Sequence, residues 1–180
     1  KAGDVIWIHD GFVCEPATVD DYIGSGGSSR SHFKITKNIT LRSVSGDARN
    51  HPNPPRLQGL YHDEEGAKTN PCDATWRGPE SGGTKAIRAL AATKGAYKGL
   101  VFEHSAHGGW HPSYAECAIY GSGYTVDKCI FRDCHGTSSM LNANITMADC
   151  VVSNNTAIDF GGGVYVTQAK TIERCQVVDN

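Results

Sequence analysis

The stretch YTVDKCIFRDC, residues 124–134, recurs twice before residue 180. It returns as ITMADCVVSNN at 145–155 and as KTIERCQVVDN at 170–180, and the three segments align without a gap. Cys129, Cys150 and Cys175 fall in one column, separated by steps of 21 and 25 residues. A recurring unit of this length is typical of proteins in which each unit stacks on the next.

The apolar positions of the repeat have a period of two. Residues 129 and 131, 150 and 152, and 175 and 177 are apolar with one residue between them, a spacing that favours strands and excludes one face of a helix. A weaker copy, AYKGLVFEHS at 96–105, places Leu100 on the cysteine column and Phe102 on the column of Phe131. We therefore predict an all-β solenoid in which Met147 and the three repeat cysteines face a shared core, the cysteines as free thiols.

The chain divides into regular and irregular stretches. We expect one domain over residues 1–180, with regular rungs over 118–180 and weaker ones before them. Residues 46–84 are polar and rich in Pro, Gly and Asn, so we predict a long loop insertion that projects from the solenoid, and a second insertion over 104–116. Both ends look cut, which suggests a piece of a longer protein.

Several segments resemble a known group. AGDVIWIHDGF (2–12), KNITLRSVSG (37–46) and VVSNNTAIDFGGGVYV (151–166) are similar to right-handed parallel β-helix repeat proteins. These are the pectate-lyase-like proteins and the polymorphic outer-membrane and adhesin-type repeats of bacteria, and Val152 takes the place of the repeat's Phe. The resemblance implies a right-handed parallel β-helix of about 21–29 residues per rung. It also implies a secreted or cell-surface location, but it leaves the activity open.

The three consecutive glycines at 161–163 fit this interpretation. A dinucleotide fingerprint needs a helix after its glycines, and a phosphate loop needs Gly-Lys-Ser/Thr. Here a short apolar run, Val-Tyr-Val, follows. We interpret the glycines as a turn between strands.

Composition excludes two classes of partner. The net charge is −2, so no basic surface argues for nucleic acid. No apolar run is long enough for a membrane span. No cofactor motif is evident.

One column of charges is the candidate catalytic patch. Adjacent rungs place Lys128, Asp149 and Arg174 one above another, with Asp127 and Glu173 beside them. If the chain is a lyase, the resemblance implies Ca²⁺-binding acids and a basic residue as the base. The same column is more simply explained as an alternating-charge ladder on an exposed surface.

A histidine-rich segment is the candidate metal site. EHSAHGGWH contains Glu103, His104, His107 and His111 within nine residues. A loop of this composition folds around a transition metal if the ligands converge, but their spacing matches no standard zinc site. A solvated loop is the alternative.

Three aromatic residues in the insertions, Trp76, Trp110 and Tyr114, are candidates for ligand contact. Their rings would stack on sugars, or would instead anchor the loops.

Three functions remain open. The first is a secreted or surface module for adhesion, carbohydrate contact or extracellular assembly, with a polysaccharide or cell-surface glycan as partner. The second is a polysaccharide lyase or glycoside hydrolase. The third is a structural filament subunit that self-associates through the open ends of the solenoid.

Overall fold

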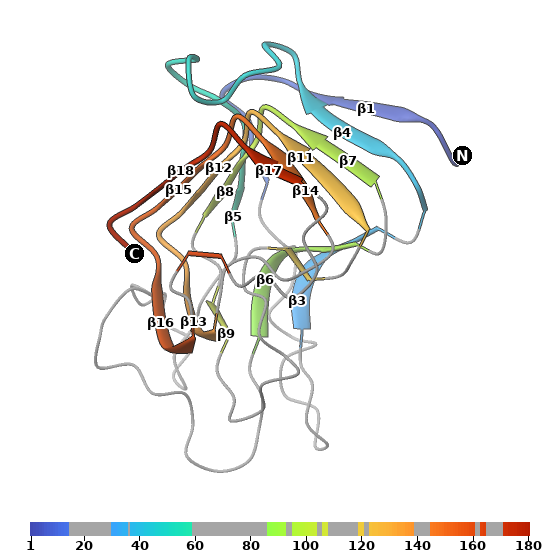
Figure 1. Cartoon of the computed structure of the whole chain (residues 1–180). Coiled ribbons are helices and arrows are strands. Elements are labelled where there is room, and N and C mark those ends of the chain that lie inside the picture. The colour runs from blue at the N-terminus through green and yellow to red at the C-terminus, as the bar shows by residue number, and fades with distance from the viewer. Residues whose placement is uncertain are drawn as a thin grey trace.

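The computed structural model describes residues 1–14, 30–35, 37–58, 86–92, 95–103, 106–107, 119–120, 123–138, 145–160, 163–164 and 171–180. Within these ranges all regular structure is β-strand, arranged in three sheets, here called A, B and C. The strands of sheets A and B lie side by side in two layers that meet at a corner (Figure 1).

Sheets A and B are parallel throughout and contain six strands each. Sheet A consists, in order, of β1 (Val5–Ile8), β4 (Thr40–Ser43), β7 (Gly95–Lys98), β11 (Tyr124–Asp127), β14 (Thr146–Ala148) and β17 (Thr171–Glu173). Sheet B consists of β2 (Val13–Cys14), β5 (Arg56–Gln58), β8 (Val101–Glu103), β12 (Ile130–Arg132), β15 (Val151–Ser153) and β18 (Gln176–Val178).

Sheet C is less regular. Its path runs through β10 (Ile119–Tyr120), β6 (Ala86–Ala92), β9 (Ala106–His107), β13 (His135–Ser138) and β16 (Thr156–Phe160), and β3 (Arg30–Ile35) pairs with β6. Strands β6 and β9 are antiparallel, and the register shifts within the β13–β16 and β3–β6 pairs.

Successive strands of the chain visit sheets A, B and C in rotation, except that β9 and β10 are consecutive and both belong to sheet C; we call each passage through the sheets a rung. All regular structure in the described residues is β-strand, as predicted, and the predicted parallel, repetitive arrangement is confirmed for sheets A and B; sheet C departs from it at the antiparallel β6–β9 pair. This arrangement is compatible with the predicted parallel β-helix.

The register reproduces the columns of the sequence alignment. Thr125 pairs with Thr146, and Thr146 with Thr171. In sheet B, Phe131 pairs with Phe102 on one side and with Val152 on the other. Residues that share a column in the ungapped alignment are therefore the residues that pair between neighbouring strands.

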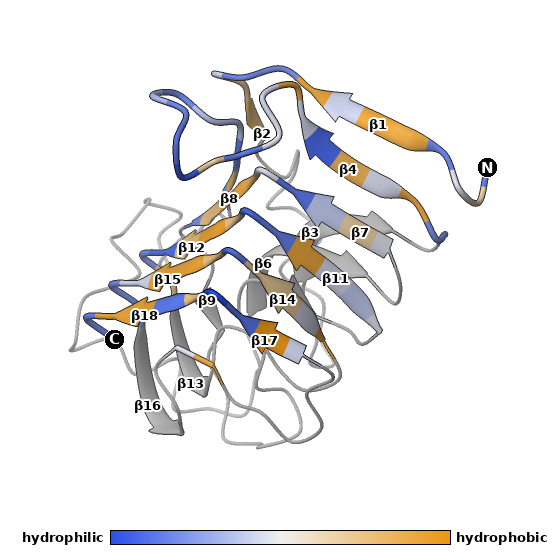
Figure 2. Cartoon of the chain, turned by 45° about the horizontal axis from the view of Figure 1, so that its top comes forward, coloured by the Kyte–Doolittle hydropathy of each residue, from blue (hydrophilic) through white to orange (hydrophobic). Residues whose placement is uncertain are grey.

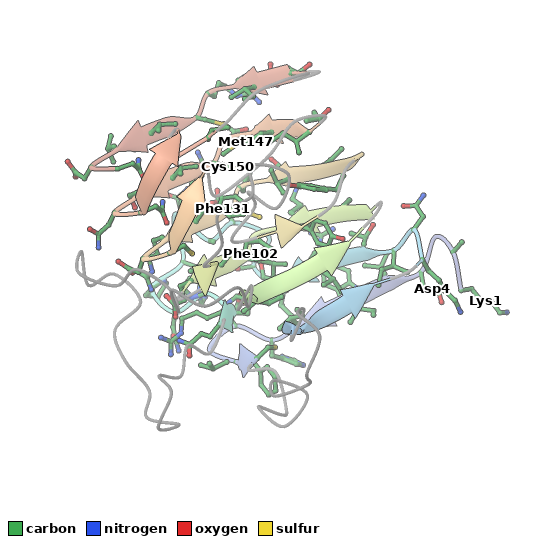
Figure 3. The ribbon with its side chains drawn as sticks, turned by 90° about the horizontal axis from the view of Figure 1, so that it is seen from below. Lys1, Asp4, Phe102, Phe131, Met147 and Cys150 are labelled. Atoms are coloured by element: carbon green, nitrogen blue, oxygen red, sulfur yellow. The ribbon has the colours of Figure 1, made fainter. Side chains whose placement is uncertain are left out.

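Apolar side chains of the repeat fill the space between the sheets. Met147, Phe131 and Cys150 have no exposed surface. Figure 3 shows Phe102, Phe131 and Cys150 following one another from rung to rung, with Met147 on the same rung as Cys150. The rings of Phe102 and Phe131 are stacked, with centroids 4.9 Å apart and an interplanar angle of 6°. Fully burying one such side chain contributes about 1.5–3 kcal/mol, so the repeated columns are the main source of stability.

The thiol column lies at the corner between sheets A and B. Cys129 and Cys150 are fully buried free thiols, as predicted, whereas Cys175 is half-buried. Each sulfur donates to the carbonyl two residues earlier; for Cys150 this is the Ala148 oxygen, 3.1 Å away. Burial and the neighbouring thiol of Cys129 raise the pKa of Cys150 far above its usual range, with the hydrogen bond to Cys129 as the largest cause. This thiol is therefore protonated and unreactive.

The residue before each of these cysteines has left-handed backbone. The φ angles of Lys128, Asp149 and Arg174 are 54°, 51° and 51°. This conformation turns the chain through the corner within two residues and leads directly from a strand of sheet A into a strand of sheet B.

The segment predicted as an insertion over 46–84 differs from expectation in its first part. Residues 56–58 form β5 inside sheet B, and the preceding stretch 44–55 lies against the corner rather than projecting from it. Ala48 is 2 % exposed, and its N–H donates to the carbonyl of Lys128 at 3.0 Å. The alternating apolar signal of β5 is only three residues long, which is too short to stand out from its Pro-rich surroundings.

Candidate functional site

The predicted charge column lies at the corner of sheets A and B. Asp149 accepts two hydrogen bonds from Arg174, with Nε 3.0 Å from Oδ1 and Nη2 2.9 Å from Oδ2. Arg49 and Asp47, from the stretch 44–55, extend the group: Arg49 Nη1 lies 3.7 Å from Asp149 Oδ1, and Lys128 Nζ lies 3.8 Å from Asp47 Oδ2. We call these five residues the corner cluster.

Ion pairing sets the charge state of the corner cluster. The hydrogen bonds from Arg174 are the largest cause that lowers the pKa of Asp149, and the same pair raises the pKa of Arg174. Partial burial acts to raise the pKa of Asp47, but hydrogen bonds from Arg49 and Asn50 outweigh it and lower that pKa. Both carboxylates are therefore ionised near neutral pH and lack the raised pKa of a general acid. The geometry is that of an alternating-charge ladder, and a catalytic role for Lys128, Asp149 and Arg174 stays a hypothesis.

A second charged group surrounds Glu103 at the end of β8. Its carboxylate is 1 % exposed and accepts hydrogen bonds from two arginines on the neighbouring strands. Arg132 Nη2 and Nε lie 2.7 and 2.9 Å from Oε2, and Arg56 Nη1 lies 3.3 Å from Oε1. Gln58 donates to Oε1 as well. A buried carboxylate is tolerated because these donors replace the lost hydration.

This group belongs to a wider surface on sheet B. Phe102, Phe131 and Val152 face the core, so the alternate residues of the same strands face outward. Two outward columns result. One runs through Arg56, Val101, Ile130, Val151 and Gln176, and the other runs through Gln58, Glu103, Arg132, Ser153 and Val178. We call the following residues the outer strip: Arg56, Glu103, Ile130, Arg132, Val151 and Ser153.

The outer strip is accessible away from Glu103. Ile130, Val151 and Ser153 are partly exposed, and the side chains of Arg56 and Arg132 are 36 % and 41 % exposed. Figure 2 shows the apolar residues of β12 and β15 next to polar residues at the strand ends. The surface therefore presents the guanidinium groups of Arg56 and Arg132 near the aliphatic side chains of Ile130 and Val151. The hydrogen-bonded strands of sheet B hold their backbone in place.

The other predicted site residues fall largely outside the described residues. Among the metal candidates, His104 and His111 lie outside them, and only the backbone of His107 is described, in β9. Glu103 binds protein donors instead, and the described residues contain no group of three or more metal-ligand side chains. The aromatic candidates Trp76, Trp110 and Tyr114 are not among the described residues either.

The sequence interpretation missed Arg56 and Arg132 as partners of Glu103. A signal was present, because aligning 96–105 with 124–134 places Glu103 directly opposite Arg132. An acid and an arginine in one outward column predict an ion pair between rungs. Arg56 carried no such signal, since its strand was not recognised.

Comparisons with known proteins returned no relative. No protein-family profile, no curated protein sequence and no solved structure matched the chain. In the described part of the chain, no helix has the length and apolar character needed to cross a membrane.

Proposed function

We propose that the chain is a right-handed parallel β-helix that acts as a non-catalytic binding module, secreted or on a cell surface, and that the outer strip contacts a polysaccharide. The observation that carries the proposal is the pairing of the two outward columns of sheet B. Aliphatic side chains of Ile130 and Val151 run beside Arg132 and Ser153 with a constant register.

This pairing suits a sugar polymer. Sugar rings have apolar faces and a rim of hydroxyl groups, so they need flat apolar contact next to fixed hydrogen-bond partners. Glu103 holds the guanidinium of Arg132 at 2.7 Å, which lowers the entropy lost when a ligand binds. Ile130 and Val151 lie about 4.8 Å apart on neighbouring strands, so they form a short apolar row along which a chain of sugars can lie.

The charge pattern supports binding rather than catalysis. Glycoside hydrolysis needs two carboxyl groups with separate roles, one of them with a raised pKa. Asp149 has a lowered pKa, and Glu103 is bound by Arg56 and Arg132. The hand of the solenoid and the extracellular location rest on the resemblance of the repeats.

Gel retardation of the 180-residue chain by soluble polysaccharides tests the proposal. We expect retardation by a uronate polymer such as polygalacturonate or alginate, or by a neutral β-glucan. Arg132→Gln removes a charged hydrogen-bond donor, and we expect it to weaken binding about tenfold or more. Arg174→Gln is the matched control, since Arg174 is also an exposed, ion-paired arginine but lies in the corner cluster. Lack of retardation by every polymer, or equal effects of both substitutions in folded variants, would rule out the outer strip.

A turnover assay distinguishes the enzyme alternative from the binding module. The chain is incubated with the same uronate polymers with and without Ca²⁺, and unsaturated products and reducing ends are followed. Product formation would replace the binding module with a lyase or hydrolase. The candidate residues for that case are Lys128, Asp149 and Arg174, with Trp76, Trp110 and Tyr114 as sugar contacts.

A further inference from the structure

Arg42, on the outer face of sheet A, is an arginine without an acidic partner. It lies in β4, which pairs with β1 on one side and with β7 on the other. Leu41 of the same strand faces the core, so the Arg42 side chain points away from the core. Figure 2 shows this hydrophilic end of β4 between β1 and β7. Because Arg42 lies on the face of the sheet, a further strand beside β1 would leave it accessible.

The guanidinium of Arg42 has no acceptor within the described part of the chain. Each of the other described arginine side chains forms an ion pair with a carboxylate, whereas Arg42 forms neither an ion pair nor a hydrogen bond. Its Nε is also closed off from solvent. A donor of this kind destabilises the fold. An anion bound at the Nη atoms would supply the partner that the other arginines have in the protein.

The ring of Trp7 holds this guanidinium in place. Cζ of Arg42 lies 4.3 Å from the centroid of the Trp7 ring, which is a cation–π contact. The contact restricts the guanidinium, so less rotamer freedom is lost when a ligand binds. A planar fork held in one orientation is suited to two parallel hydrogen bonds with an oxyanion.

A second cation lies beside Arg42. Lys98 in β7 is directly opposite it in the ladder, and like charges in this arrangement repel. Lys98 Nζ forms an ion pair with Asp127 Oδ2 at 2.7 Å, and the Lys98 side chain is 35 % exposed. Two cations and one carboxylate leave a single positive charge unbalanced, and an anion of single charge would balance it.

Gly46 leaves space between the two cations. A Cβ added to Gly46 would lie 3.2 Å from Arg42 Nη2 and 3.8 Å from Lys98 Cε. The two cationic side chains therefore flank the position that a side chain at residue 46 would occupy. The absence of that side chain keeps the space over Gly46 open to a ligand.

From these observations we propose that Arg42 and Lys98 bind an oxyanion of single charge, a sulfate ester or a carboxylate, over Gly46 on the outer face of sheet A. Trp7 is a positioning residue that orients the guanidinium, and Asp127 competes with the anion for Lys98. The outer strip lies on sheet B, so this site does not depend on polysaccharide binding there.

Titrations of the isotope-labelled 180-residue chain, followed by proton–nitrogen correlation spectra, test the site. The Nε–H signal of Arg42 is identified by its loss in Arg42→Gln. Methyl sulfate and acetate are added separately, each against sodium chloride at the same ionic strength, because added salt alone screens charges. We expect a saturable shift of the Arg42 signal with the oxyanions and none with chloride. The affinities of the two oxyanions distinguish a sulfate ester from a carboxylate.

Two variants are expected to change the affinity in opposite directions, followed at the backbone N–H of Gly46. Arg42→Gln removes a charged donor, and we expect about tenfold weaker binding or more. Asp127→Asn frees Lys98 from its carboxylate, and we expect severalfold tighter binding. A gain of affinity cannot come from misfolding, so Asp127→Asn keeps the test decisive if Arg42→Gln is unstable.

Lys37→Gln is the control, since it removes a charge from an exposed residue before β4 and is expected to keep wild-type affinity. Shifts no larger than those in chloride would overturn the proposal. Equal affinities of Arg42→Gln and Lys37→Gln would do so as well, as would unchanged or weaker binding by Asp127→Asn. Polysaccharide retardation is read separately, so failure of one proposal leaves the other intact.

Discussion

After the first rung, the corner between sheets A and B is built in two ways, and the two versions depend on different residues. In the later rungs two residues make the corner, the first left-handed and the second buried, as in Lys128-Cys129 and Asp149-Cys150. Between β4 and β5 the corner is the twelve-residue stretch 44–55. The short corner is part of the repeat, whereas the long corner is not and lies over the short corners of the following rungs.

The contacts of the long corner show this dependence. It rests on the short corner of the next rung at Gly99, where an added Cβ would lie 2.6 Å from the Gly46 carbonyl carbon and 2.7 Å from the Asp47 nitrogen. It also reaches one rung further, through Ala48 N and the Lys128 carbonyl. The core columns therefore specify the stack, while the long corner is an addition that the stack supports. Four predictions test this order.

The largest effect is expected in the core column. Met147→Asp places an unpaired charge where the wild-type side chain has no exposed surface. Because Met147→Ala alone would cost about 2–5 kcal/mol, we expect Met147→Asp to unfold the rungs. Thermal denaturation followed by circular dichroism measures this, with Thr125→Asp, exposed on the neighbouring strand, as the control. An unchanged midpoint for Met147→Asp would reverse the assignment of inside and outside.

The second effect concerns the junction of the two corners. Gly99 has φ +65°, and its Cβ would lie 2.3 Å from Ser43 Oγ. Left-handed strain of about 1–2 kcal/mol adds to overpacking of about 1–3 kcal/mol, so we expect Gly99→Ala to destabilise by about 2–5 kcal/mol. Urea denaturation gives this free energy.

The matched control for Gly99→Ala is Lys128→Gly, at the next short corner. Lys128 already has φ 54°, so glycine there relieves strain and removes only a long ion pair to Asp47. We expect a change within about 1 kcal/mol. If both substitutions change the free energy of unfolding equally, the stretch 44–55 does not pack tightly on Gly99, and the long and short corners do not differ in this respect.

The third effect extends the comparison to the corner between sheets B and C. There the buried second residue is Asn155, whose Oδ1 accepts from Cys134 N at 3.1 Å and whose Nδ2 donates to Phe131 O at 3.2 Å. Asn155→Ala leaves buried backbone groups unpaired, and we expect a loss of about 1–3 kcal/mol in urea denaturation. Asn154→Gly, at the exposed left-handed residue before it, is the control. Equal losses of stability from the two substitutions would mean that the side-chain amide of Asn155 does not stabilise this corner.

The sequence predicted the interior of this molecule better than its surface. The column of Phe102, Phe131 and Val152 is recognisable in the sequence because the position is buried in successive rungs and is therefore restricted to apolar residues. The corner residue Lys128 and the sheet B strand at Arg56 were harder, since left-handed backbone tolerates several polar residues and a three-residue strand carries little periodicity. The ion pair of Arg56 and Glu103 joins residues 47 positions apart in the sequence. They meet only because β5 and β8 are neighbours in sheet B.

The smallest effect is expected from the ion pair of the corner cluster. The pKa of Asp149 is lowered in the folded chain, mainly by the hydrogen bonds from Arg174. A lowered pKa stabilises the fold above the unfolded value of about 3.9. That contribution is lost as the pH falls through the lower, folded value. We therefore expect Asp149→Asn to be slightly less stable than wild type near neutral pH.

The dependence of stability on pH below neutrality tests this expectation. The urea midpoints of the wild type and Asp149→Asn are measured from pH 7 to pH 2, and we expect them to converge at the acid end. High salt is also expected to reduce the difference at pH 7, since exposed charge pairs are screened. Asparagine tolerates the left-handed backbone of position 149, φ 51°, as well as aspartate does. A difference that persists in acid would therefore mean that the substitution does not act through the loss of the charge, and that the ion pair to Arg174 is not what stabilises this corner.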